Sequence, residues 1–362
     1  MSVQLQQILC ILLLLIGVLF FHSRNNTQLK KEEDKNYRVL WLVAVLFSLF
    51  YCSGYDYFSY KKNYEDYIFY GFQGAHMEQI YYWTMNIAPF GYLSWRILIW
   101  GLAAFVWILV CKELKCSGKY AGLVILVMPL FQYFYYLREA LPFGMMLLGI
   151  CKLQSDQKNI RNRIFAYALL VASAFLHKSI ILYIFLYLLS RYVPFNKVSV
   201  ILSLLAVPLL RKVVDVISHT FLGMTLFTDT LTSQYGNVYL AQETVIDYNF
   251  GGYLRLFLTY FPIVYAIVYY SIVINRKGFN DRYSKLVSFS YYIMYLFLLF
   301  WDNVGHTNMA LRFFATSCVP VSFFMAYRLS QQNFIGKQER VIIYSSVVYI
   351  VFTLLLTIFF FK

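Results

Sequence analysis

Charged side chains are scarce in this sequence of 362 residues: Asp, Glu, Lys and Arg together make up 13% of it, against 60% apolar residues. So few charges cannot cover the surface of one water-soluble globule of this size. Apolar runs of the roughly 20 residues that a helix needs to cross a bilayer recur from end to end. The composition therefore predicts an all-α, polytopic integral membrane protein.

Several motifs that carry nucleotide or metal chemistry are also absent. The chain has no GxxxxGK[ST] phosphate loop, no HExxH zinc motif, no CxxC pair and no D-x-D metal–nucleotide pair. These absences argue against an ATPase, a zinc protease and an enzyme that uses sugar nucleotides. We therefore expect a substrate that arrives already activated, and neither a metal nor another cofactor.

The apolar runs group into about twelve expected spans. The first has no basic residue before its apolar core and no small-residue cleavage site after it, so we expect an uncleaved anchor. The runs on either side of His177 form one stretch of about 30 residues, which fits one tilted helix or two short helices. The spans lie near residues 5–22, 38–54, 92–111, 120–136, 140–153, 162–176, 179–193, 197–212, 253–274, 284–301, 309–327 and 340–361.

Basic residues set the expected orientation. Six loops hold about 21 of the 31 Lys and Arg residues and alternate with loops that have few. The positive-inside rule places those six loops in the cytoplasm and both termini outside. This topology, together with attraction to anionic lipid, explains the net charge of +14. We therefore expect no nucleic-acid partner.

Two long segments fall on the expected outer side, at residues 55–91 and 213–252. Both are rich in Tyr and Phe, and neither has the composition of a separate domain. We therefore expect residues 1–362 to form a single polytopic membrane domain, with these two outer loops packed as caps over the membrane core.

Arg138 stands out among the basic residues that run against the positive-inside trend. It lies at the outward end of one span and is the first residue of "REALPF", which is typical of a helix start with Pro142 in the first turn. A charge in hydrocarbon costs at least about 2.5 kcal/mol, so such a residue usually faces a cavity. The helix would direct its N–H groups and positive dipole end to the same place. An anion site is predicted, unless Glu139 or headgroups merely neutralise the arginine.

A second polar stretch, "FLHKSI", interrupts an apolar run at its expected outward end. His177 could act there as a general base or as a hydrogen-bond donor to a leaving group, with Lys178 beside it. A lone histidine is more often structural, and that alternative stays open.

A third stretch, "WDNVGHTNMALRFF", covers residues 301–314. Asp302 and His306 belong to its outward turn, and Arg312 lies inside the span that follows. A guanidinium at that depth is costly unless it faces a polar cavity. The same reasoning applies to Arg255, just within the span that opens after "NFGGY".

Together these stretches resemble the EpsG-like members of the Wzy polysaccharide polymerases. An arginine ends one span, and an "A-S-x-F-x-H-x-S" pattern ends a later one. One departure is Glu139, where the family commonly has glutamine. A carboxylate at this position would compete with an anionic ligand for Arg138. The matching residues are Arg138, Glu139, Ala140, Ala172, Ser173, Phe175, His177 and Ser179, with Asp56 and Tyr60 in "GYDYFSYKKNYE" and Arg312 in "ALRFF".

The resemblance implies a metal-independent glycosyltransferase at the outer face of the bacterial cytoplasmic (inner) membrane. Such polymerases transfer a growing glycan from undecaprenyl pyrophosphate to a hydroxyl of an incoming lipid-linked repeat unit. The implied partners are the undecaprenyl-pyrophosphate-linked oligosaccharide, membrane lipids, a flippase and a chain-length regulator.

That chemistry gives the residues expected roles. Fixed guanidinium groups would stabilise the departing pyrophosphate, for which Arg138 and Arg312 are the expected catalytic residues. The acceptor hydroxyl must lose a proton, with His177 as the leading base and Asp56 as the alternative. The expected substrate-binding residues are Arg255, Lys178, Tyr60, Glu139, Asp302 and His306.

Two other classes stay open. A transporter, such as a flippase for lipid-linked sugars, would also place charges in a membrane cavity, but would more often show inverted repeats and acidic coupling residues. A membrane O-acyltransferase would need a histidine in an acyl-donor channel, and would leave several outward arginines without a role.

Overall fold

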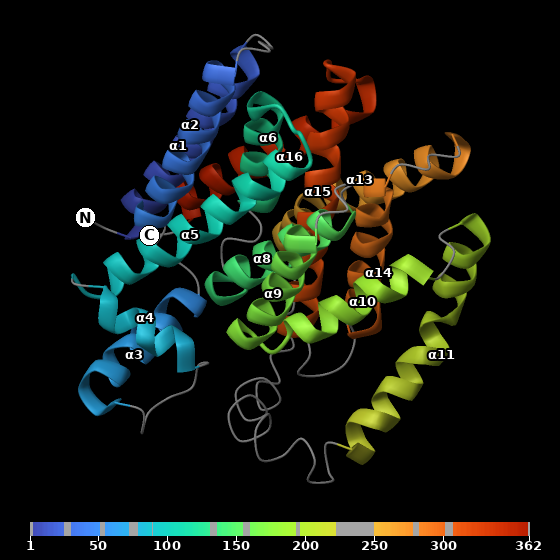
Figure 1. Ribbon diagram of the computed structural model, residues 1–362, viewed down its shortest axis with the longest axis horizontal. Coiled ribbons are helices and arrows are strands. Elements are labelled where there is room, and N and C mark those ends of the chain that lie inside the picture. The colour runs from blue at the N-terminus through green and yellow to red at the C-terminus, as the bar shows by residue number, and fades with distance from the viewer. Residues whose placement is uncertain are drawn as a thin grey trace.

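A computed structural model describes residues 3–24, 30–50, 55–71, 79–88, 90–130, 136–154, 160–192, 196–221, 250–277, 282–300 and 307–360. Within those ranges every regular element is a helix (Figure 1), which confirms the all-α prediction. The helices are α1 (Val3–Ser23), α2 (Lys30–Phe50), α3 (Tyr55–Tyr70), α4 (Gln79–Ile87), α5 (Tyr92–Glu113), α6 (Gly118–Ile125), the π-helical η2 (Leu126–Leu130), α8 (Leu137–Gln154), α9 (Ile160–Leu176), α10 (Ile180–Tyr192), α11 (Lys197–Phe221), α13 (Phe250–Lys277), the 3-10 turn η4 (Arg282–Ser284), α14 (Lys285–Phe300), α15 (Thr307–Gln332) and α16 (Lys337–Phe360).

Four helical segments are long and apolar enough to cross a membrane, Gln4–Ser23, Tyr92–Glu113, Phe257–Ile274 and Lys337–Phe359. They support a multi-pass membrane protein. The described parts of the other expected spans fall largely on helix, but several of these helices are short, so the count of about twelve stays a prediction. Outward-facing apolar side chains such as Ile16 and Leu205 are exposed, as expected of a surface in contact with lipid.

The apolar stretch around His177 forms two helices rather than one tilted helix. α9 ends at Leu176, and α10 begins at Ile180 after a short turn. The His177 N–H donates to the Ser173 carbonyl at 3.1 Å, and the His177 carbonyl accepts from the Ile180 N–H at 3.0 Å. The turn therefore holds His177 between two helix ends.

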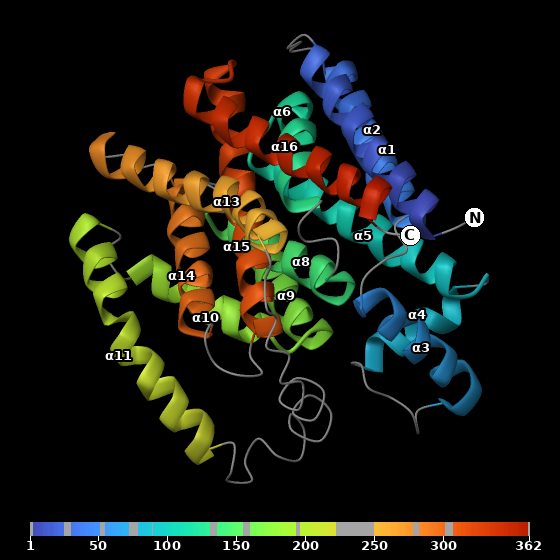
Figure 2. The same ribbon diagram turned by 180° about the vertical axis from the view of Figure 1, so that it is seen from behind.

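α8 is the central helix of the site described below, and glycines let its neighbours approach it closely. α8 packs against α5 and α9. A Cβ atom on Gly144 would lie 2.6 Å from Trp107, and one on Gly149 would lie 2.9 Å from the Ala166 carbonyl oxygen. Small residues at such contacts are typical of packed membrane helices. On the far side, α13 packs against α16 and α16 against α1 (Figure 2).

The helix ends joined by basic loops meet at one end of the molecule. Lys152 Nζ of α8 lies 3.0 Å from Glu113 Oε2 of α5. The Ser117 N–H, just before α6, donates to Ser330 Oγ of α15 at 2.7 Å. We call this the basic end, defined by the ends of α5, α8 and α15 and the beginnings of α6 and α16.

At the opposite end of α5, helices α3 and α4 lie together (Figure 1, lower left). The Tyr64 ring of α3 lies 5.9 Å from the Tyr92 ring, and Trp95 Nε1 donates to Thr84 Oγ1 of α4 at 2.9 Å. Residues 55–91 thus place two short helices against the start of α5, which we call the cap. Most of the other expected outer loop, 213–252, lies outside the described residues.

Candidate site at the start of α8

α8 begins at Leu137, next to the cap. The N–H groups of Glu139 and Ala140 both donate to the Tyr136 carbonyl, each at 3.0 Å. Pro142 is therefore the sixth residue of the helix, and the prediction that it lies in the first turn is wrong by one turn. The helix starts earlier because the Tyr136 carbonyl already accepts its first hydrogen bonds.

Pro142 has a consequence for Arg138, four residues before it. A proline has no N–H, so the Arg138 carbonyl lacks the donor that a helix would normally supply. The Tyr81 hydroxyl of α4 donates to this carbonyl at 2.5 Å. Tyr81 and Arg138 are both buried, and a buried carbonyl needs a donor. The proline thereby joins the cap to the residue that carries the guanidinium.

The Arg138 side chain lies against the cap. Its Nε–H donates to the Tyr60 hydroxyl at 3.4 Å, and its guanidinium carbon lies 5.4 Å from the centre of the Tyr60 ring. Only 6% of Arg138 is exposed. A buried guanidinium over an aromatic face keeps its charge and has a fixed orientation. The structure thus brings Arg138 and Tyr60 together, two residues that the sequence singled out separately.

Glu139 and His177 form a second buried pair. Glu139 Oε1 lies 3.4 Å from His177 Nε2, and both residues are buried. The Glu139 carboxylate thus lies against an imidazole, and its expected competition with a ligand for Arg138 stays a prediction. A carboxylate in this position orients the ring and stabilises an imidazolium.

Arg312 approaches the same place from α15. That helix begins at Thr307, so Arg312 lies in its second turn. The Arg312 guanidinium carbon is 5.4 Å from the centre of the Tyr136 ring, directly before α8. Arg312 and Arg138 therefore both lie at the start of α8.

Tyr183 of α10 links α15 to α8. Its hydroxyl donates to Thr316 Oγ1 at 3.3 Å, and Thr316 Oγ1 donates to the Arg312 carbonyl at 2.8 Å. The Tyr183 ring also lies 5.2 Å from the Phe143 ring of α8. Residues of α8, α10, α15 and the turn between α9 and α10 thus meet at one location, which we call the α8 site.

The remaining predicted residues are placed less fully. Lys178 is exposed in the turn after His177. Asp56 lies in α3 and Arg255 lies in α13, but their side chains are outside the described structure. Asp302 and His306 lie outside the described residues.

Three tyrosines in or near the α8 site were missed by sequence reasoning, namely Tyr81, Tyr136 and Tyr183. The chain contains 34 tyrosines, and no spacing distinguishes these three from the rest. The sequence contains one indication of such a contact: because Pro142 has no N–H, the Arg138 carbonyl needs a donor from outside the helix.

The α8 site combines two kinds of chemistry. Two guanidinium groups and the N-terminal end of a helix can bind an anion with several negatively charged oxygens. The buried imidazole and its carboxylate can accept and hold a proton. Among the described residues, no group of three or more His, Cys, Asp and Glu side chains is arranged to hold a metal ion.

Comparison with known proteins gives one match. A search of curated proteins and a search of solved structures each found nothing similar to this chain. The model of the EpsG family matches residues 37–362, which include the cap and every residue of the α8 site. Since that match covers most of its length, the chain belongs to the EpsG family.

Proposed function

We propose that this EpsG family protein is a polysaccharide polymerase, which joins lipid-linked repeat units at the outer face of the bacterial cytoplasmic membrane. Family membership and the apolar helices support a membrane protein of polysaccharide biosynthesis. The observation that carries the finer proposal is that Arg138 lies in the first turn of α8 while Arg312 lies against the Tyr136 ring directly before that helix.

The two arginines would act on the leaving group. When the glycosidic C1–O bond to undecaprenyl pyrophosphate breaks, negative charge grows on the pyrophosphate. Arg138, Arg312 and the first N–H groups of α8 would bind that charge more tightly as it develops, which lowers the barrier. Planar guanidinium groups suit this ligand, because each can contact two phosphate oxygens.

His177 would act on the acceptor. The acceptor hydroxyl oxygen forms the new bond to C1, and its proton has to be taken up as that bond forms. If Nε2–H is donated to Glu139, Nδ1 carries the lone pair that takes the proton. The Glu139 carboxylate then stabilises the positive imidazolium. Asp56, in the neighbouring cap helix α3, is the alternative base.

An apolar cavity near α15 offers a place for the lipid chain. It has a volume of about 320 Å³ and lies between α11, α13, α14 and α15. Phe314, two residues beyond Arg312, lines it together with Phe297 and Met294. A polyprenyl chain would suit the apolar lining of this cavity.

The proposal is tested by glycan growth. Membranes that contain the protein, supplied with purified lipid-linked repeat units, should yield a ladder of longer glycans. Movement of unpolymerised units across the bilayer would instead support a flippase, and acylated units of unchanged length would support an O-acyltransferase.

Tyr81→Phe should slow glycan growth by about tenfold, because it removes the hydrogen bond that Tyr81 donates to the buried Arg138 carbonyl, a loss of about 1–3 kcal/mol. Pro142→Ala supplies an N–H at the position that normally bonds to this carbonyl. We therefore expect Tyr81→Phe with Pro142→Ala to recover much of the lost rate, measured as repeat units joined per minute.

Tyr64→Phe is the matched control, since the buried Tyr64 ring packs on the same cap. It should leave the rate close to that of the wild type. If Tyr81→Phe matches the wild type, or if Pro142→Ala makes it worse, the cap does not position Arg138 through this bond.

A further inference from the structure

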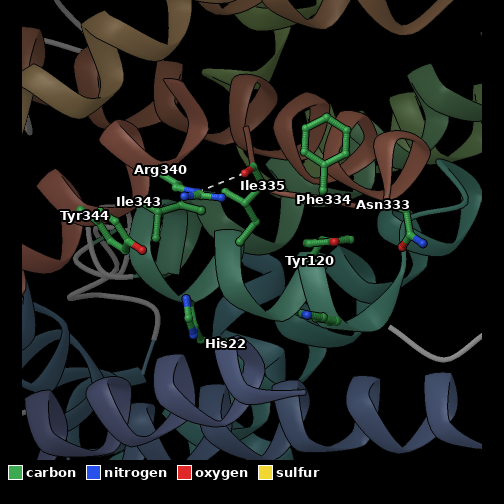
Figure 3. Close-up of a pocket in the computed structure, with 9 residues that line it drawn as sticks. His22, Tyr120, Asn333, Phe334, Ile335, Arg340, Ile343 and Tyr344 are labelled. Carbon is green, nitrogen blue, oxygen red and sulfur yellow. Dashed lines mark hydrogen bonds between the residues drawn. The ribbon is translucent and has the colours of Figure 1, made fainter. Parts of the chain in front are cut away.

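A second cavity lies at the basic end, between the end of α1, the start of α6 and the α15–α16 turn (Figure 3). Its volume is about 450 Å³, within the range of roughly 300–1,000 Å³ typical of ligand sites. His22 projects into it from α1, and Arg340 lies on α16 across from it. About 30 Å of helix separates this end of α15 from Arg312. The cavity is therefore distinct from the α8 site.

The residues that line the cavity carry a net positive charge. Lys119 and Arg340 both line the cavity, and no Asp or Glu does so. Among the described residues neither cation has a carboxylate partner, whereas Lys112 lies 3.2 Å from Asp34 at the same end. Arg340 donates its Nε–H to the Ile335 carbonyl at 3.2 Å, which leaves its terminal NH₂ groups for a ligand. Such a cavity favours an anion.

The neighbouring surface is apolar and exposed. Tyr344, which lines the cavity, is followed along α16 by the exposed Val348 and Leu355 at helical spacing. On α1, the exposed Leu19 and Ile16 lead away from His22. These side chains begin at the cavity and continue along the helices into the apolar part of the molecule. A ligand whose charged group sits in the cavity can therefore lay hydrocarbon chains along the same helices.

We propose that this cavity binds the phosphate group of an anionic phospholipid, in the leaflet that the basic loops face. The phosphate would accept hydrogen bonds from Arg340 and Lys119, and its acyl chains would lie along α16 and α1. Basic pockets between membrane helices are suited to such headgroups. Free phosphate has the same charged group but would make no use of the apolar surface. This inference does not depend on the proposed polymerase activity.

Binding to the purified full-length protein tests it. Dioleoyl-phosphatidylglycerol, dioleoyl-phosphatidylcholine and inorganic phosphate are titrated separately in detergent, and bound lipid is counted by native mass spectrometry. We expect saturable binding of phosphatidylglycerol, much weaker binding of phosphatidylcholine, and little displacement by millimolar phosphate. The double variant Lys119→Gln, Arg340→Gln should bind phosphatidylglycerol roughly 30-fold more weakly, because both basic groups are lost.

Two controls keep the outcome clear. Arg163→Gln removes an exposed basic residue of α9 at the same end, outside the cavity, and should bind as the wild type does. Lys119→Arg with Arg340→Lys keeps both charges and should retain most of the affinity. If the double glutamine variant does not fold, Arg340→Gln alone, at an exposed position, is measured in its place. Unchanged affinity after loss of the charges would overturn the proposal, and full displacement by inorganic phosphate would reassign the cavity to a soluble anion.

Discussion

Glycan growth should fall by at least about 10²–10³-fold when either Arg138 or Arg312 is replaced by alanine, the loss typical of removing one donor to a developing negative charge. The Arg138 guanidinium lies against the Tyr60 ring of the cap, and the Arg312 guanidinium lies against the Tyr136 ring directly before α8. Each group therefore has a defined orientation. Arg138→Lys and Arg312→Lys should also fail, because an ammonium group cannot contact two phosphate oxygens in one plane. The measurement is ladder length per amount of protein in the membrane.

Lys61→Ala is the matched control for these arginines. Lys61 lies on the exposed face of the cap helix α3, with Nζ 3.8 Å from Glu65 Oε1. An exposed pair of this kind contributes little, so this variant should produce normal ladders. Normal ladders from Arg138→Ala and Arg312→Ala as well would remove both arginines from the reaction.

The second large effect concerns His177. Loss of a general base typically slows a reaction by about 10²–10⁴-fold, and His177→Ala should fall in that range. The wild-type rate should decline at acidic pH, because an imidazole that already carries a proton cannot accept one from the acceptor hydroxyl. A variant without the imidazole should lose this decline. The readout is the initial rate of repeat-unit joining as a function of pH.

His177→Gln separates the base from a structural role. Glutamine can still donate a hydrogen bond to the buried Glu139 carboxylate, but it cannot take up a proton at neutral pH. We expect this variant to be as stable as the wild type and as inactive as His177→Ala. Full activity in His177→Gln would assign a structural role to the histidine and make Asp56 the next residue to test.

The helices could be predicted from the sequence because their apolar runs are long and uninterrupted. The resemblance named both Arg138 and Tyr60, but their contact was not predicted, since these residues are 78 positions apart. The tyrosines of the α8 site could not be predicted, because their partners lie on other helices. Such contacts depend on how helices pack, and a local pattern does not record packing.

The contact of Glu139 also could not be predicted from its neighbours in the sequence. Its position beside Arg138 suggested competition between carboxylate and ligand for the guanidinium. Successive residues of a helix point about 100° apart, and in the structure Arg138 meets Tyr60 while Glu139 meets His177. Adjacent residues in the sequence therefore contact partners on different elements.

The most direct test uses the purified protein in liposomes, supplied only with purified undecaprenyl-pyrophosphate-linked repeat units. Glycan length and free undecaprenyl pyrophosphate are measured together over time. A polymerase should release one undecaprenyl pyrophosphate for each linkage formed, and the Arg138→Ala and Arg312→Ala proteins should release almost none. If glycan length stays constant while intact units cross the bilayer, the protein is a transporter and the proposed role of the α8 site is wrong.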